Sequence, residues 1–210
     1  MTSDAASFLP VDMRNTGKLT VYCGPMFAGK SSSLIAELEL ACEDGKRVLV
    51  IKPKIDNRYS NDDIISHDGV SLKDVTGHDV LVLDVDACVK LEDLEDVDLL
   101  LIEEAHFFTT LHEQIKAYML MGVDIVAVGL DMDSDGEPFG IMPHLLSMAN
   151  NIYKLTGLCA VCQQEATMTF RKLVARSMSQ VLVGGSETYE PRCFAHWVLG
   201  NEEKHHWYNA

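Results

Sequence analysis

The segment Gly24-Pro25-Met26-Phe27-Ala28-Gly29-Lys30-Ser31 follows a short apolar run, precedes a helical pattern and has the form G-x-x-x-x-G-K-S. This form is typical of a phosphate-binding loop, in which backbone N–H groups and the start of the next helix face one anion. Lys30 supplies a mobile cation for the outer phosphates of a nucleotide, and Ser31 supplies a hydroxyl for the Mg²⁺ that the nucleotide carries. The alternative is a glycine-rich turn that only caps a helix, and the flanking patterns favour the phosphate loop.

Strand and helix patterns alternate on both sides of this loop. We predict strands at residues 18–23, 47–51, 80–83, 99–102, 123–130 and 152–155, and helices at residues 31–44, 108–121 and 142–148. The polar segment 53–76 is expected to form a long loop. Regular alternation of strands and helices predicts an α/β fold with a doubly wound, mainly parallel sheet.

Composition limits the class of protein. The chain has 210 residues, of which 47% are hydrophobic, and its formal net charge is −15. This acidic balance disfavours duplex nucleic acid and anionic membranes as partners, because both are bound through positive surfaces. No apolar run approaches the roughly 18 residues of a membrane-spanning helix, and residues 1–17 lack the basic and apolar regions of a signal peptide. The six cysteines show no disulfide-like spacing, which indicates a reducing compartment.

Four residues near the C-terminus form two pairs with metal-ligand spacing, Cys159-x-x-Cys162 and Cys193-x-x-His196. Three thiolates and one imidazole suit a tetrahedral zinc ion. Because four protein ligands leave no position for water, we expect a structural zinc that holds together a small second module. His205 and His206 offer further metal ligands, but their polar C-terminal context favours a surface position.

Two carboxylates, Glu103 and Glu104, follow the apolar run 99–102. P-loop enzymes use acids at this place, one near Mg²⁺ and one near the reacting group. Because adjacent side chains on a strand point to opposite faces, we expect one carboxylate to face the metal and the other the acceptor hydroxyl. Arg58 is a candidate for stabilising a transferring phosphoryl group, with a surface arginine as the alternative. Three phenylalanines, Phe107, Phe108 and Phe139, are expected either to line a pocket for a planar substrate or to pack in the core.

Taken together, these motifs resemble the type II thymidine kinases of animal cytosol, many bacteria and large DNA viruses or phages. The matching segments span residues 18–197 and occur in the order 24–31, Asp56-Asn57-Arg58-Tyr59, Ser66-His67-Asp68, Ile102-Glu103-Glu104 with Phe107-Phe108, Leu130-Asp131, Pro138-Phe139-Gly140, Lys154-Leu155-Thr156, both zinc pairs, and Gly184-Gly185 with Tyr189. The combination of the loop with GG-x-x-x-Y before the second zinc pair is more specific than a phosphate loop alone. The resemblance implies a RecA-like P-loop core with a mainly parallel sheet and a small, zinc-ribbon-like C-terminal lasso module.

The same resemblance implies phosphorylation of the 5′-hydroxyl of thymidine or deoxyuridine by ATP and Mg²⁺. Glu104 resembles the general base, Lys30 and Arg58 resemble phosphate and transition-state contacts, and Ser31 and Glu103 would bind Mg²⁺. The implied ATP and phosphate contacts are Gly24, Pro25, Met26, Phe27, Ala28, Gly29, Lys30, Ser31, Ser32 and Asp56. The implied nucleoside contacts are Met26, Phe107, Leu130, Phe139, Thr169, Leu182, Gly184 and Tyr189. A cytoplasmic homotetramer is also implied.

We expect the chain to divide into four segments. These are an N-terminal arm at residues 1–17, a nucleotide-binding domain at 18–156, a zinc-binding lasso at 157–200 and a tail at 201–210. In the resemblance, the lasso reads the thymine edge through its backbone, so the zinc affects activity without taking part in the chemistry.

Several residues depart from the family pattern. Glu103 occupies a position where the family usually has Asp, and Ser134 and Asp135 replace an aromatic and a basic residue. Two alternatives follow: a kinase that prefers another pyrimidine nucleoside, and a catalytically silent ATP-binding zinc protein. A zinc-dependent nucleic-acid binder is a further alternative, and the net charge of −15 counts against it.

Overall fold

The centre of the molecule is a six-stranded parallel sheet. The computed structural model describes residues 16–55, 64–65, 69–77, 80–84, 86–172 and 184–209. The strand order is β3-β2-β4-β5-β1-β6, and each neighbouring pair is parallel. The strands are β1 (Leu19–Cys23), β2 (Val48–Pro53), β3 (Val80–Leu83), β4 (Leu99–Ile102), β5 (Asp124–Gly129) and β6 (Asn151–Lys154). The predicted α/β fold with a mainly parallel sheet is therefore confirmed.

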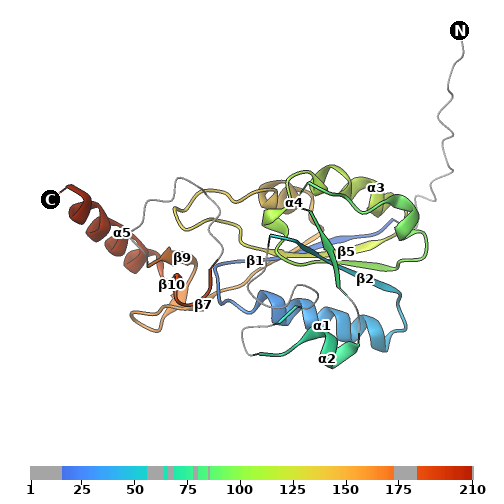
Figure 1. Ribbon diagram of the computed structural model, residues 1–210, viewed down its shortest axis with the longest axis horizontal. Helices are drawn as coiled ribbons and strands as arrows, with labels where there is room; N and C mark the ends of the chain where they lie inside the picture. The colour runs from blue at the N-terminus through green and yellow to red at the C-terminus, as the bar shows by residue number, and fades with distance from the viewer. Residues whose placement is uncertain are drawn as a thin grey trace, which may run out of the picture.

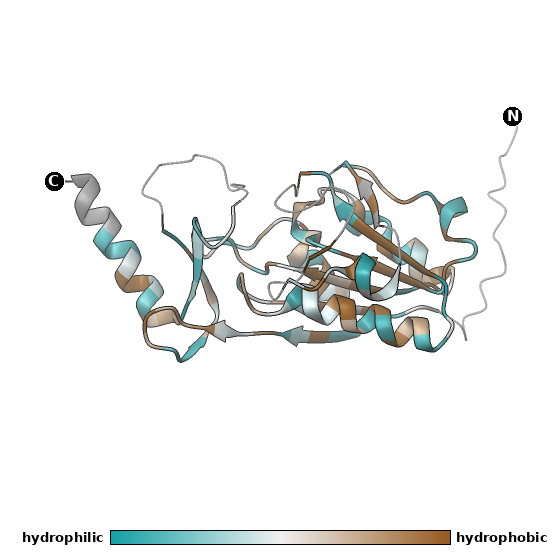
Figure 2. Ribbon diagram, turned by 60° about the horizontal axis from the view of Figure 1, so that its bottom comes forward, coloured by the Kyte–Doolittle hydropathy of each residue, from teal (hydrophilic) through white to brown (hydrophobic). Residues whose placement is uncertain are grey.

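Helices cover both faces of this sheet (Figure 1). One face carries α1 (Lys30–Glu43) and α2 (Leu72–Thr76), and the other carries α3 (Ile115–Leu120) and α4 (Met142–Met148). Two buried clusters result, because Leu99 and Leu101 of β4 pack with α1 while Leu100 and Ile102 pack with α3 and α4. Apolar residues accordingly concentrate on the strands and on the sheet-facing sides of the helices (Figure 2). Burial on both faces explains why these strands read as continuous apolar runs.

The helix predicted over residues 108–121 was wrong in its extent. Phe108 is extended, and the segment then forms a 3₁₀ turn, η3 (Leu111–Glu113), before the short α3. Thr109 and Thr110 are poor helix formers, which accounts for the late start. The expected apolar face is present, since Leu111 and Ile115 are fully buried.

The polar segment 53–76 is not wholly a loop, because its end folds into α2. The side chain of Ser71 accepts a hydrogen bond from the Asp74 amide at 3.0 Å and caps this helix. The two remaining 3₁₀ turns are η1 (Leu91–Leu94) and η2 (Ala105–Phe107).

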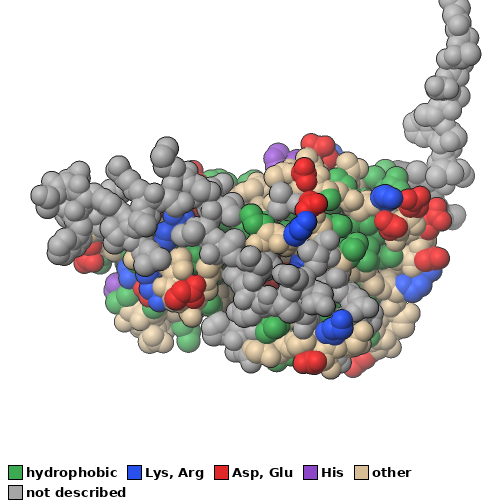
Figure 3. All heavy atoms as spheres, in the orientation of Figure 1, with side chains coloured by type: hydrophobic (Ala, Val, Ile, Leu, Met, Phe, Trp, Pro, Cys, Tyr) green, Lys and Arg blue, Asp and Glu red, His purple; other side chains and the backbone are tan. Residues whose placement is uncertain are grey.

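A smaller C-terminal module lies beside the carboxyl end of β1 (Figure 1). It contains the antiparallel pairs β7 (Gly157–Leu158) with β8 (Glu165–Ala166) and β9 (Met168–Arg171) with β10 (Tyr189–Arg192), followed by α5 (Phe194–Asn209). Among the described residues, no helix combines the length and the apolar character that a membrane crossing requires. On the described part of the face in Figure 3, Lys and Arg side chains are interspersed with Asp and Glu.

Candidate active site

The predicted phosphate loop joins the carboxyl end of β1 to the start of α1. Its backbone has positive φ at Gly24 (137°), Phe27 (64°) and Gly29 (80°). A Cβ at Gly24 would lie 2.2 Å from the Leu155 carbonyl oxygen, so only glycine fits there. Alternation of left-handed residues with right-handed ones turns successive N–H groups toward one side of a loop. The loop therefore has the backbone of an anion-binding nest at a helix N-terminus.

A partly buried polar contact connects this loop to the end of β4. The hydroxyl of Ser31 donates a hydrogen bond to Oε1 of Glu103 at 2.6 Å, and Glu103 is 5% exposed. Lys30, which is also buried, donates through Nζ to the Pro25 carbonyl at 2.6 Å. A serine hydroxyl beside a carboxylate is the hard-oxygen donor set that suits Mg²⁺. Glu103 follows β4 and Ser31 follows β1, with β5 between them, and the glutamate side chain, longer than the aspartate usual in the family, reaches the serine hydroxyl.

The two carboxylates are separated by a turn and not by strand alternation, so that part of the prediction was wrong. Strand β4 ends at Ile102, and neither Glu103 nor Glu104 belongs to it. Glu104 has φ 46° and ψ 46°, the left-handed conformation, and it caps η2. Non-glycine residues held in this conformation are strained and tend to cluster at functional sites.

A buried histidine that the sequence analysis did not single out lies against Glu104. His106 is 2% exposed, and its Nδ1 is 3.4 Å from Oε2 of Glu104. The backbone N–H of Leu130 donates to the same Nδ1 at 3.1 Å. Because Nδ1 accepts this bond, we assign the neutral ring with its proton on Nε2. A ring in this form donates no hydrogen bond from Nδ1 to Glu104, so it packs against the carboxylate and does not pair with its charge.

Three predicted nucleoside contacts gather around this histidine. The His106 ring centroid lies 4.1 Å from that of Phe107 and 4.5 Å from that of Phe139. The two phenylalanine rings meet edge to face at 5.9 Å. Leu130 joins them through its amide. Since the four residues come from segments that follow β4 and β5, the carboxyl edge of the sheet brings them together beside Glu104.

The other residues predicted to contact the nucleoside, within the described part of the chain, lie on or next to the C-terminal module. Thr169 of β9 is 4% exposed and accepts a hydrogen bond from the Met26 amide of the phosphate loop at 3.0 Å. Tyr189 of β10 is buried, and its amide donates to the Gly185 carbonyl, next to Gly184. Thr169 therefore ties the module to the phosphate loop directly.

The four predicted zinc ligands converge in this module. The ligand atoms of Cys159, Cys162, Cys193 and His196 all lie within 4.8 Å of one another. The Sγ atoms of Cys162 and Cys193 are 3.9 Å apart, and Cys159 Sγ is 3.7 Å from His196 Nδ1. A tetrahedral zinc with bonds of about 2.3 Å to sulfur places its ligand atoms about 3.8 Å apart, so the donor set and its spacing fit the ion.

The electrostatics of the first ligand also suit a metal-bound thiolate. Burial alone would raise the pKa of the Cys159 thiol, but hydrogen bonds from the backbone of Cys193, Cys162 and Val161 lower this pKa below its ordinary value. The thiolate is the form that binds metal. By contrast, burial raises the pKa of Cys23, at the end of β1, to about 11, so that thiol stays protonated.

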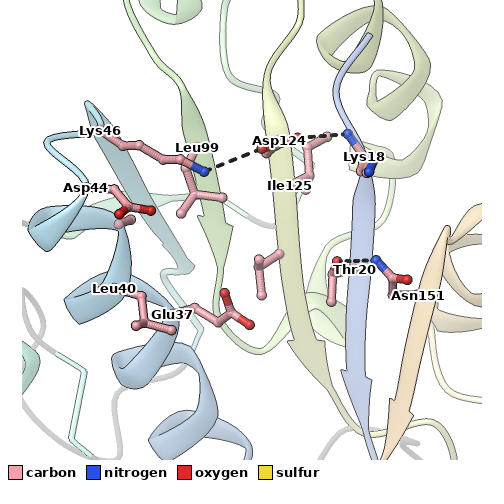
Figure 4. A pocket seen from close by; sticks show the side chains of 12 residues that line it. Lys18, Thr20, Glu37, Leu40, Asp44, Lys46, Leu99, Asp124, Ile125 and Asn151 are labelled. Atoms are coloured by element: carbon pink, nitrogen blue, oxygen red, sulfur yellow. Dashed lines mark hydrogen bonds and ion pairs between the residues drawn. The ribbon is translucent and has the colours of Figure 1, made fainter. Parts of the chain in front are cut away.

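A separate cavity lies at the opposite edge of the sheet, where the strands begin (Figure 4). Its volume is about 280 Å³, and its lining includes Lys18, Glu37 and Asp124. In parallel sheets, ligands bind outside the carboxyl ends of the strands, which is the other edge. We therefore place the candidate active site at the phosphate loop and not in this cavity.

Some predicted site residues lie outside the described residues, namely Asp56, Arg58 and Leu182. Within the described part, the structure brings Ser31 to Glu103, Met26 to Thr169, and Phe107 and Phe139 together near Glu104. A family model described as thymidine kinase matches residues 17–197 of this chain.

Proposed function

Because this chain belongs to the thymidine kinase family, we propose that it transfers the γ-phosphoryl group of ATP to the 5′-hydroxyl of thymidine or deoxyuridine. Family membership makes the chain a nucleoside kinase. The proposal of this particular reaction rests on the position of Glu104 beside His106, whose ring packs against Phe139, at the same sheet edge as the phosphate loop. The aromatic side chains suit a flat base, and the carboxylate suits a hydroxyl that must lose its proton.

The proposed reaction divides the site between two carboxylates. Glu104 accepts the proton of the 5′-hydroxyl, whose oxygen attacks the γ-phosphorus while the bond to the β-phosphate oxygen breaks and ADP leaves. Lys30 and the loop amides stabilise the phosphate oxygens, and Ser31 with Glu103 would hold Mg²⁺, which offsets phosphate charge when bound. Arg58 is proposed as a further transition-state contact, and Asp56 as a phosphate contact. The hydrogen bond from Ser31 to Glu103 supports the metal assignment.

The proposed binding of substrates uses the whole carboxyl edge. ATP phosphates would lie on residues 24–32, and the nucleoside would contact Met26, Phe107, Leu130, Phe139, Thr169, Leu182, Gly184 and Tyr189. The Cys₃His cluster is compatible with a structural zinc. The domain division at residues 17, 156 and 200 stays part of this proposal.

A cytoplasmic homotetramer is proposed on the strength of the family. The edge strand β6 supports self-association, because Ile152 and Tyr153 are 51% and 49% exposed. Light scattering after size exclusion would measure the assembly, and a monomer at micromolar concentration would contradict this part. Neither nucleic acid nor membrane is proposed as a partner, in keeping with the charge of −15.

The test is phosphoryl transfer to a panel of pyrimidine nucleosides, with Glu104→Gln as the decisive variant. Because Gln keeps the shape of Glu but cannot accept the proton, we expect kcat to fall by about 10²-fold or more while ATP binding is retained. Glu113→Gln, which changes an exposed carboxylate on η3, is the matched control. An inactive wild type that binds ATP firmly would support a silent nucleotide-binding protein instead.

A second candidate is a kinase with a shifted nucleoside preference. It is favoured by Ser134 and Asp135, which stand in the loop that leads to Phe139. Thymidine ranking below another nucleoside in kcat/KM would select this candidate.

A further inference from the structure

Trp197 of α5 links the metal-binding module to the loop between β5 and α4. Its indole N–H donates a hydrogen bond to the Ser134 carbonyl oxygen at 3.1 Å. Beside this bond, a Cβ on Gly136 would lie 3.1 Å from the indole ring, so the ring edge packs directly on the glycine backbone. Trp197 is half-buried by these contacts. A polar bond and a packing contact thus hold one side chain against one loop.

The first turn of α5 is fixed by the zinc ligands and by β10. Trp197 follows His196 directly, and its amide donates to the Cys193 carbonyl at 2.9 Å. Arg192 donates through Nη1 to the His196 carbonyl at 3.0 Å, and its guanidinium lies 3.5 Å from the centre of the Phe170 ring. The position of the indole therefore depends on the geometry of the ligand cluster.

The loop that Trp197 contacts is internally stiff and ends in the candidate nucleoside site. The side chain of Asp133 accepts hydrogen bonds from the amides of Asp135 and Glu137, each at 2.9 Å. The Asp133 amide donates to the Glu137 carbonyl, and the Phe139 amide donates to the Asp131 carbonyl. These bonds join Ser134 to Phe139 through one hydrogen-bonded loop, so the position of one constrains the position of the other.

We propose that Trp197 is a positioning residue that couples the zinc-ligand cluster to the nucleoside side of the active site. This inference rests on the proposed function, because it concerns the binding of that nucleoside. The indole of Trp197 contacts the loop at Ser134, where the side chain of the loop itself is small. A different contact, from Met26 to Thr169, ties the module to the phosphate loop. Perturbing Trp197 therefore affects the nucleoside more than ATP.

The test compares steady-state constants of Trp197→Phe with those of the wild type. Phe keeps a ring but lacks the N–H donor, so we expect the KM for the nucleoside to rise about 2- to 10-fold, as for loss of one hydrogen bond, with the KM for ATP unchanged. Gly136 has φ 85°, so Gly136→Ala strains the loop backbone as well as crowding the indole ring. We therefore expect it to raise the same KM by more than Trp197→Phe does. Leu199→Ala, at a 53% exposed position of α5, is the control.

Fluorescence gives a readout that does not depend on turnover. The chain has two tryptophans, so Trp207→Phe leaves Trp197 as the single emitter. We expect its emission to change when thymidine binds and when a chelator removes zinc, with zinc content and circular dichroism measured alongside. Unchanged emission in both titrations, or an unchanged nucleoside KM in Trp197→Phe and Gly136→Ala of an active enzyme, would overturn this inference alone. A wild type without nucleoside phosphorylation would overturn the proposed function and this inference with it.

Discussion

Replacing Thr169 by Val should weaken the junction between the phosphate loop and the C-terminal module. The two side chains have nearly the same shape, so the change removes the Oγ1 that accepts the Met26 N–H at 3.0 Å and little else. Thr169 and Met26 are 4% and 8% exposed, so water does not easily replace the lost acceptor. An unsatisfied buried amide costs about 1–3 kcal/mol, which sets the expected loss in free energy of unfolding.

This loss should be visible in thermal unfolding at fixed zinc concentration. For a chain of this size, 1 kcal/mol corresponds to about 2–4 °C, so we expect Tm to fall by roughly 2–12 °C. The KM values for ATP and for the nucleoside should both rise, because Met26 belongs to the phosphate loop and Met26 and Thr169 are also proposed nucleoside contacts.

Thr20→Val is the matched control for Thr169→Val. Its hydroxyl accepts a longer bond of 3.3 Å from the exposed Asn151, and such surface changes stay within about 0.5 kcal/mol. If Thr169→Val lowered Tm no more than Thr20→Val, the argument that the buried amide depends on this acceptor would be refuted.

Three other perturbations follow from the structure. Removing zinc with a chelator, or substituting Cys193→Ser, should lower Tm and unfold the C-terminal module, whereas Cys88→Ser, at a half-buried cysteine outside the ligand cluster, should lower Tm far less; atomic absorption would check for one zinc per chain. His106→Ala should lower kcat by about tenfold, because the Leu130 amide loses its acceptor and Glu104 its neighbour, and His106→Asn, which keeps an acceptor, should restore part of it. Burial raises the pKa of Tyr118 to about 12, above the value of about 10 in the unfolded chain. The neutral hydroxyl therefore contributes stability that is complete below pH 10 and is lost as the pH rises toward 12. Denaturation of Tyr118→Phe across this range should show a weaker pH dependence than that of the wild type.

The parts of the fold that the sequence predicted are those with strong periodic or spaced signals. The apolar run at 99–102 became β4, and the helix after Lys30 became α1 with nearly the expected limits. The four zinc ligands were predicted because Cys159 with Cys162, and Cys193 with His196, each have the spacing of metal ligands, and together they make a tetrahedral donor set. Such signals depend on local residue types, which the sequence displays directly.

The features that escaped prediction depend on contacts between distant segments. The left-handed turn at Glu104 has no local signal, since glutamate gives no cue for positive φ. His106 acquires its role only when the Leu130 amide, from another strand end, points at Nδ1. The contact of Trp197 with Ser134 was not predicted either, because a separation of 63 residues leaves no pattern in one sequence. Helix α5 was also missed.

The backbone conformation of Glu104 has a consequence for laboratory evolution. A glutamate held at φ 46° costs about 1 kcal/mol or more relative to a residue that tolerates this region, such as Gly or Asn. Selection of a variant library for survival of heating alone would therefore enrich Gly or Asn at position 104. Selection for turnover would retain Glu at this position, so the two selections would favour different residues.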